Sequence, residues 1–151
     1  ARNRGKHIMS DEAGVRAASD KFYAALTSMC RGDAAPMAEV WWAEDGAAST
    51  MHPIGGRDIG VDAVLGSFGN VAGISTAGHV AISEQIIRVN GDTAWERGQE
   101  TGDITMGGHA ATIDQRVTNV YARRGGEWRL VHHHADISPG MLEVLGKLKG
   151  G

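Results

Sequence analysis

Residues 79–137 decide the fold, and they read HVAISEQIIRVNGDTAWERGQETGDITMGGHAATIDQRVTNVYARRGGEWRLVHHHADI. Four long segments of this stretch, at residues 79–89, 93–105, 110–123 and 128–137, have the composition and alternation of strands. Glycine-containing runs separate them, at residues 90–92 (Asn-Gly-Asp), 106–109 (Met-Gly-Gly-His) and 125–126 (Gly-Gly). Because such runs are typical of hairpin turns, the sequence predicts an antiparallel meander.

Helices are predicted before and after the meander along the sequence. Ser10 is a typical N-cap residue, and apolar residues recur after it at spacings of three and four as far as Met29, which predicts one long helix. A short strand at residues 47–52 and three further helices, beginning after Asp33, at Gly60 and after Ser138, complete the set. Helices gathered before and after a run of sequential strands indicate the α+β class.

Length and composition describe one domain of ordinary character. The chain has 151 residues, 42% of them hydrophobic and 22% charged, and its apolar runs are too short for a membrane helix. A net charge of −3 argues against a nucleic-acid or membrane-surface binder. The single cysteine, Cys30, excludes an intramolecular disulfide and favours a reducing cytoplasm.

The N-terminal segment is basic and is set apart from the domain. Residues 1–9 include ARNRGKHI and then Met9, with no apolar run of the length that a signal peptide needs. We expect these residues to be an appended or disordered arm, with a nucleic-acid arm as the alternative, and residues 10–151 to form the domain.

The last predicted strand carries three consecutive histidines. Because side chains alternate between the faces of a strand, Trp128 and Leu130 mark the buried face and carry His132 and His134 inward, with His133 outward. Inward histidines are either core residues with satisfied ring nitrogens or part of a pocket wall. A metal site is not expected, since the pair lacks a third ligand nearby.

The strand at residues 110–123 offers further polar candidates. If Val120 faces the core, then Arg116 and Thr118 do so as well, but Val117 and Tyr121 make the opposite face equally apolar. An inward arginine would need a carboxylate or an anionic ligand, and the alternative is a surface salt bridge. Periodicity alone does not decide between the two faces.

His52 is the third candidate. It ends the first predicted strand, directly before Pro53 and the Gly55-Gly56 turn, where a strand can open into a cavity. An imidazole in that place can exchange a proton near neutral pH. The alternative is an ordinary turn residue.

Five motifs resemble those of a known family. They are FYAAL at 22–26 with Gly32-Asp33, MHPIGGR at 51–57 with Gly60, GDTAW at 91–95, RVT at 116–118 and WRLVHHH at 128–134. In this order they resemble the SnoaL-like (ketosteroid-isomerase-like, nuclear-transport-factor-2-like) superfamily, in its subgroup with a terminal W-R-x-V-H-x-H strand. The resemblance implies a curved antiparallel sheet that forms a cone around the long first helix. It also implies a homodimer through the outer face of the sheet, where we expect Val117, Val131 and Tyr121, or their neighbours, to form an apolar patch that a second copy covers.

The chemistry of the family carries over only in part. Ketosteroid isomerases use a tyrosine on the first helix, an aspartate base at the end of the first strand and an aspartate acid on a later strand. The matching positions hold Phe22 (with Tyr23 adjacent), His52 and a residue near Thr118. Steroid isomerisation is therefore not expected, while a histidine base for another proton transfer is.

Two classes of function stay open. One is an isomerase, cyclase or dehydratase that needs no cofactor, and the other is a non-catalytic ligand-binding or dimerisation module, because one fold hosts both. Polyketide cyclases of this fold use an aspartate–histidine arrangement, which we expect only Asp114 or Asp136 to imitate here.

We expect a cavity at the open end of the cone, occupied by a small hydrophobic molecule. The expected ligand-binding residues are Phe22, Tyr23, Trp42, Phe68 and Thr118. The expected catalytic residues are His52 as general base, His132 or His134 as its partner, and Arg116 opposite developing negative charge. No metal, cofactor, nucleic acid or membrane partner is expected.

Overall fold

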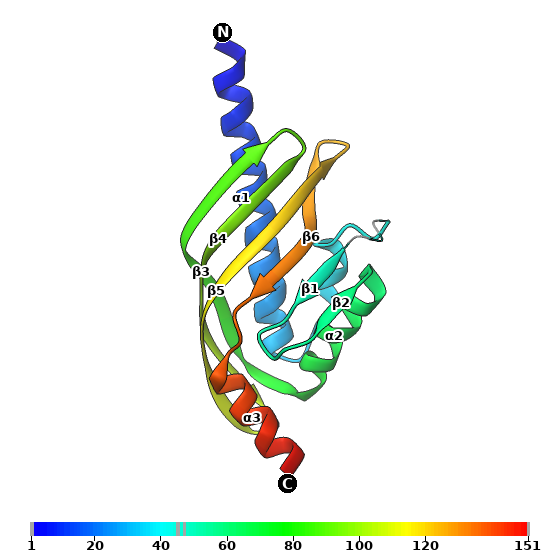
Figure 1. The fold of residues 1–151 in the computed structure, drawn as a ribbon, viewed down its shortest axis with the longest axis vertical. Coiled ribbons are helices and arrows are strands. Elements are labelled where there is room, and N and C mark those ends of the chain that lie inside the picture. Colours follow the sequence, from blue (N-terminus) through cyan, green and yellow to red (C-terminus); the bar gives the residue numbers. More distant parts are fainter. Residues whose placement is uncertain (1, 45, 47, 151) are drawn as a thin grey trace.

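The computed structural model describes residues 2–44, 46 and 48–150, with side chains from residue 11 onward. The elements in chain order are α1 (Arg2–Cys30), the 3₁₀ helix η1 (Ala35–Glu39), β1 (Ser49–Met51), β2 (Arg57–Ile59), α2 (Val61–Ile74), β3 (Ser75–Asn90), β4 (Thr93–Met106), β5 (His109–Arg124), β6 (Glu127–Ala135) and α3 (Pro139–Gly150) (Figure 1). Within this described part, no helix is both long and apolar enough to cross a membrane.

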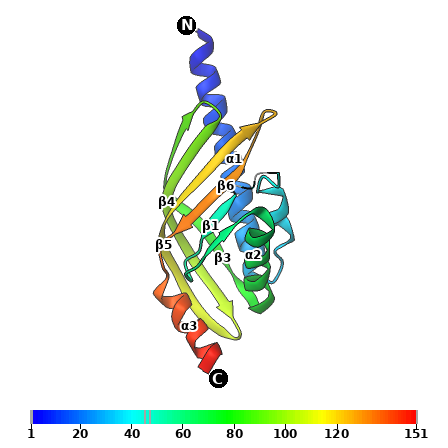
Figure 2. The same cartoon turned by 45° about the vertical axis from the view of Figure 1, so that its right-hand side comes forward.

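All the strands belong to one sheet, in the order β2-β1-β6-β5-β4-β3. Neighbouring strands are antiparallel except β1 and β6, which run parallel. The long strands β3 to β6 bend around α1, with α2 and the β1–β2 hairpin to one side and α3 at the lower end (Figures 1 and 2). The predicted α+β fold, with a curved sheet around the first helix, is confirmed.

The start of α1 and the presence of β2 differ from the sequence predictions, and β3 begins at Ser75 instead of residue 79. Helix α1 begins at Arg2 and not at Ser10, because the segment before Ser10 contains no proline and a single glycine, so nothing in it ends a helix. Strand β2 was not predicted, since three residues are too few to show an alternating pattern. It pairs with β1 across a turn in which Gly55 and Gly56 have positive φ angles.

Two of the three residues predicted to cap helices, Asp33 and Ser138, bond the start of a helix, whereas Ser10 lies inside α1. Asp33 Oδ1 accepts a hydrogen bond from the Ala35 amide at 2.9 Å, and Ser138 Oγ accepts one from the Met141 amide at 3.3 Å. The Ser138 amide also donates to the Pro53 carbonyl at 2.7 Å, which ties the start of α3 to the β1–β2 hairpin. The predicted strand at residues 47–52 is β1, although residue 47 lies outside the described residues.

A β-bulge at Val131 reverses the faces of β6. Leu130 pairs with Tyr121 and His132 pairs with Val120, so Val131 is an extra residue on β6. Before the bulge Leu130 points inward, as predicted. After it the alternation is shifted by one residue, so His133 is buried and His134 is exposed.

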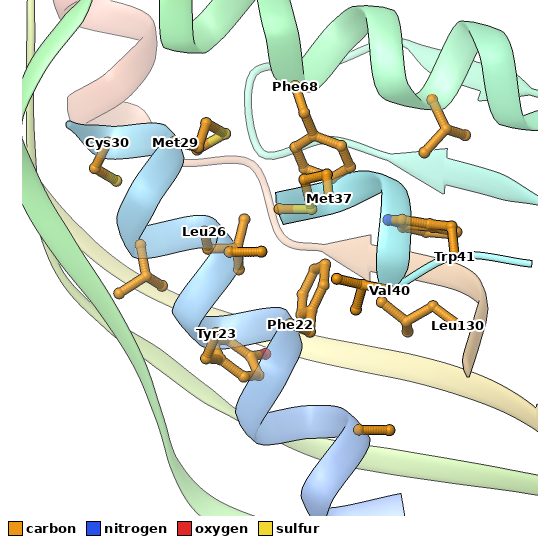
Figure 3. Packing of buried hydrophobic residues seen from close by; sticks show 14 of the residues in the cluster. Phe22, Tyr23, Leu26, Met29, Cys30, Met37, Val40, Trp41, Phe68 and Leu130 are labelled. Atoms are coloured by element: carbon orange, nitrogen blue, oxygen red, sulfur yellow. The ribbon is translucent and has the colours of Figure 1, made fainter. Parts of the chain in front are cut away.

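The core lies between α1, the sheet and α2 (Figure 3). Phe22 on α1 is fully buried and meets Trp41 and Phe68 edge-on, with ring centroids 6.3 and 6.4 Å apart. The inner face of β5 contributes odd-numbered residues, from Ala111 to Tyr121. The polar members of that inner face are the ones that build the site.

Candidate functional site

A cavity of about 430 Å³ lies between α1, α2, α3, the β1–β2 hairpin and the sheet. Its walls are mostly apolar, with Leu26 and Phe68 from the helices and Ile104 and Ile113 from the strands. Met141 and Leu145 of α3 close one side. An apolar cavity with a few converging polar groups is the usual form of a small-molecule site.

A histidine–aspartate pair forms one wall of the cavity. Asp58 pairs with Thr50 across the β1–β2 hairpin, and His52 follows β1 directly, so these side chains meet on the inner face. His52 Nε2 lies 2.8 Å from Asp58 Oδ2 and 2.8 Å from Thr50 Oγ1. The His52 ring also meets Phe68 edge-on, with centroids 5.3 Å apart.

Asp58 is the anionic member of the pair. Its Oδ2 accepts hydrogen bonds from Ser67 Oγ at 2.5 Å and from Thr50 Oγ1 at 3.3 Å. The hydrogen bond from Ser67, together with those from His52 and Thr50, lowers the pKa of Asp58 from its ordinary value despite partial burial. An ionised Asp58 accepts a hydrogen bond from the Nε2–H group of His52, which leaves Nδ1 as the unprotonated nitrogen of the neutral ring.

The same cavity also contains a buried carboxyl group. Glu100 on β4 lines the cavity and is 2% exposed. Tyr23 Oη donates a hydrogen bond to Glu100 Oε2 at 2.8 Å. Gln115, which lies on the neighbouring strand β5 and pairs with Glu100, donates one from Nε2 to Glu100 Oε1 at 3.0 Å. Burial raises the pKa of Glu100 to about 7, against the lowering effect of these two hydrogen bonds. This carboxyl is therefore partly protonated near neutral pH.

A buried hydrogen-bond chain supports that carboxyl. Asn119 Nδ2 donates to Tyr23 Oη at 3.1 Å and to Glu96 Oε1 at 2.9 Å, and Tyr121 Oη donates to the same Glu96 oxygen at 2.8 Å. Burial raises the pKa of Tyr23 above its ordinary value, so its hydroxyl keeps its proton and acts as the donor to Glu100.

His133 joins the chain to the cavity. Asn119 uses its amide nitrogen on Tyr23 and Glu96, so its Oδ1 accepts from His133 Nδ1, 2.6 Å away. This bonding assigns the proton of the neutral ring to Nδ1. Burial lowers the pKa of His133 to about 3, with an added contribution from the charge of His52. His133 is thus a neutral part of the wall and a poor base.

The expected positions of His132 and His134 are corrected by the bulge. Both lie on the outer side of β6, where His132 Nδ1 bonds Ser49 Oγ at 2.7 Å and His134 is exposed. His52 and His132 therefore sit on opposite faces of the sheet. The inward histidine of β6 is His133.

Arg116 and Thr118 also lie on the outer face, contrary to expectation. The fully buried Tyr121 fixes the odd-numbered residues of β5 inside, so the even-numbered ones point out. The Arg116 side chain is 81% exposed and pairs with Asp136 at 2.6 Å, which is the surface salt bridge named as the alternative.

Of the expected aromatic residues, Phe68 lines the cavity and the others do not. Phe22 lies behind the wall in the core, and Tyr23 reaches the site only through its bond to Glu100. Trp42 lies against the guanidinium groups of Arg124 and Arg129 and donates to the Ala122 carbonyl.

Sequence reasoning missed Asp58, Glu100, Gln115 and His133. In the cavity, the aspartate that bonds a histidine is Asp58 and not Asp114 or Asp136, because the β1–β2 hairpin brings Asp58 beside His52. The turn at Gly55-Gly56 was the available signal for this pairing. In the described residues, no three His, Cys, Asp or Glu side chains gather as a metal site.

Comparison with known proteins gives one family and several solved structures with a similar fold. A family model described as a SnoaL-like domain matches residues 15–138. The search of curated proteins found no match. A structure from Streptomyces avermitilis named "putative dehydratase from the NTF2-like family" is 27% identical, with a TM-score of 0.74, and covers 84% of this chain and 95% of its own.

Two further structures show the range of the fold. A "putative calcium/calmodulin-dependent protein kinase type II association domain" from Thiobacillus denitrificans is also 27% identical, with a TM-score of 0.65, covering 81% of this chain and 93% of its own. A "putative aromatic ring hydroxylase" from Novosphingobium aromaticivorans is 17% identical, with a TM-score of 0.74, covering 85% and 90%. The last similarity concerns the fold alone.

Proposed function

The chain belongs to the SnoaL-like domain family, and from that premise we propose that it is an enzyme that moves protons on a compact, mainly apolar substrate. The observation that carries the proposal is one cavity with a histidine–carboxylate pair and a second, buried carboxyl group that holds a proton near neutral pH. Two titratable sites with opposite roles in one apolar cavity are typical of acid–base catalysis.

His52 is the proposed general base. Asp58 and Thr50 hold its Nε2, so that Nδ1 is the proton acceptor and Asp58 stabilises the imidazolium that forms. His133 is less suitable, because burial keeps its pKa far below neutrality. His52 thus combines access to the cavity with an anionic partner.

Glu100 is the proposed general acid, and the reaction that uses both groups is the dehydration of a β-hydroxy carbonyl compound. His52 removes the proton α to the carbonyl, and the electron pair of that C–H bond forms the C=C bond. The C–O bond breaks, and the leaving hydroxyl takes the Glu100 proton to become water. Imidazolium and carboxylate return to their resting forms by proton exchange with water.

The family relation supports this choice of reaction. The Streptomyces avermitilis structure with 27% identity is named as a dehydratase candidate, and it matches nearly its whole length. The cavity of about 430 Å³ suits a compact substrate.

The test is turnover of a simple substrate of this class. The aldol adduct of acetone and benzaldehyde loses water to give a conjugated, strongly absorbing ketone, which is followed by ultraviolet absorbance. We expect turnover by the wild-type chain, its loss in His52→Ala and Glu100→Gln, and its retention in His79→Ala, an exposed histidine on β3. Absence of turnover across a panel of β-hydroxy ketones would contradict the proposal.

A non-catalytic association module is the second candidate. The observation that favours it is the equal identity, 27%, to the Thiobacillus denitrificans structure named for an association domain. A stable oligomer that neither binds nor converts any member of the ketone panel would support this candidate. Turnover that depends on His52 would exclude it as the whole function.

We further propose a homodimer in the cytoplasm. The exposed Trp95 on β4 supports an interface on the outer face, and the single free cysteine, Cys30, is consistent with a reducing compartment.

A further inference from the structure

One buried polar atom in the described part of the cavity wall has no hydrogen-bond partner. Gln115 is 4% exposed and lines the cavity, and its Nε2 donates to Glu100 Oε1. Its Oε1 is buried and has no hydrogen-bond partner among the described residues. A buried acceptor without a donor is costly, and it is tolerated where a ligand supplies the donor.

The surrounding chain fixes which end of the amide is free. Asn119 donates to Tyr23, Tyr23 donates to Glu100 Oε2, and the other Glu100 oxygen accepts from Gln115 Nε2. The Gln115 nitrogen thus donates to Glu100, and its buried oxygen is the atom left without a donor.

The neighbours of this atom define the rest of the ligand. Gln115 on β5 pairs with Glu100 on the neighbouring strand β4, and the same cavity wall includes Ile104 and Ile113. A ligand at this place therefore meets one acceptor beside one carboxyl group, within apolar surroundings.

We propose that this part of the cavity is a subsite for a hydroxyl group, in which Gln115 Oε1 accepts the hydrogen bond of the ligand O–H. This inference rests on the proposed dehydration and deepens it, because the hydroxyl held there is the leaving group. The hydroxyl donates its hydrogen to Gln115 Oε1 and lies beside the Glu100 carboxyl group, from which it takes a proton as it leaves. The substrate class is thus a compact apolar β-hydroxy carbonyl compound whose hydroxyl end is bound next to Gln115.

Binding of simple probes tests the subsite without turnover. The probes are β-naphthol, which donates an O–H hydrogen bond, its methyl ether, which does not, and naphthalene, and affinity is measured by fluorescence titration. We expect the wild-type chain to bind β-naphthol roughly 10-fold more tightly than either comparator, the range of one hydrogen bond with its desolvation cost. This comparison needs no variant.

Two matched variants locate the preference. Gln115→Met removes the acceptor at similar volume and is expected to make the three affinities nearly equal. Gln99→Met is the control, because Gln99 is on the neighbouring strand β4 and its amide bonds Asp114 on the outer face. That control is expected to keep the preference for β-naphthol.

The outcomes separate the subsite from the reaction. Equal affinities in the wild type, a preference that persists in Gln115→Met, or tighter binding of the ether would overturn the subsite, whether or not ketones are turned over. A preference that depends on Gln115 in a chain with no turnover would retain the subsite and reject the dehydration.

Discussion

The two nitrogens of His52 have different partners, and this difference determines the expected effect of changing the residue. Nε2 is held by Asp58 and Thr50, while Nδ1 has no hydrogen-bond partner among the described residues. The ring is therefore oriented by its environment before any substrate binds, as a general base requires.

Replacing His52 by alanine is expected to lower kcat/KM by about 100-fold or more, the contribution of one general base. The melting temperature should change little, because Asp58 keeps its hydrogen bonds from Ser67 and Thr50. The measurement is steady-state kinetics on the ketone identified in the panel, beside a thermal melt. Unchanged kinetics in a folded variant would remove His52 from the mechanism.

The buried carboxyl of Glu100 makes stability depend on pH. Its pKa in the folded chain, about 7, lies above the ordinary value of 4.5, so the folded state binds more protons than the unfolded state between these values. The contribution of this group to the free energy of unfolding is therefore greatest below pH 4.5 and is lost as pH rises towards 7. A shift of this size corresponds to about 3 kcal/mol.

The Glu100→Gln variant is expected to lack this decrease in the free energy of unfolding at higher pH. Urea unfolding of the wild type and the variant at pH 5 and pH 8 measures it, as the difference between the two proteins at each pH. The variant should gain stability relative to the wild type on going to the higher pH. An equal difference at both values would show that Glu100 titrates normally.

The contribution of His133 to stability changes with pH in the opposite direction to that of Glu100. Its pKa of about 3 in the folded chain lies below the ordinary value of 6.5, so the unfolded state binds more protons between these values. Stability from this group is complete above pH 6.5 and is lost as pH falls towards 3. His133→Gln, which keeps a donor for Asn119 Oδ1, is expected to flatten the acid side of the unfolding curve. A curve as steep as that of the wild type would contradict the assignment.

At the scale of elements, the sequence predicted what depends on local periodicity and turn chemistry. The four long strands and the Ser138 cap follow from alternating residues and from glycine or serine–proline signals. The inward face of the last strand could not be predicted in the same way. A single extra residue at Val131 moves His133 inward, and nothing local to the sequence marks that bulge.

The site escaped prediction for a related reason. Glu100 and Gln115 are neighbours only through the register of β4 and β5, and both lack a motif. Asp58 belongs to a strand too short to be recognised. Sequence periodicity reports one element at a time, whereas a buried polar network is a property of the register between strands.

The close approach of β3 and β4 gives a prediction for one glycine. Gly102 has a φ of +150°, and a Cβ there would stand 1.9 Å from the His79 carbonyl oxygen. Gly102→Ala is therefore expected to destabilise the fold by several kcal/mol, since backbone must move. Gly69→Ala on α2 is the control: its Cβ meets nothing within 4 Å, and helix propensity predicts a gain of up to about 1 kcal/mol. Equal melting temperatures for the two variants would contradict this account.

At the scale of the whole molecule, the outer face of the sheet is more polar than the sequence predicted. Val117 and Tyr121, expected outside, are buried inside, and Arg116 and Thr118 occupy the outer positions of β5 instead. Trp95 on β4 is one large apolar exception, 42% exposed and paired with Val120 on β5, and Ile59 on β2 is another, 65% exposed. A large aromatic side chain on the solvent-exposed face of a sheet is typical of a protein–protein interface.

The expected dimer should therefore depend on Trp95. Light scattering at micromolar concentration is expected to give the mass of two chains for the wild type and of one chain for Trp95→Arg, because an arginine pair facing itself across a two-fold axis repels and fills the space of the indole poorly. Leu142→Arg is the matched control, since Leu142 is 40% exposed but lies on α3. Both variants should keep β-naphthol binding, because neither residue lines the cavity. A wild type with the mass of one chain, or a Trp95→Arg variant with the mass of two, would move the interface elsewhere or remove it.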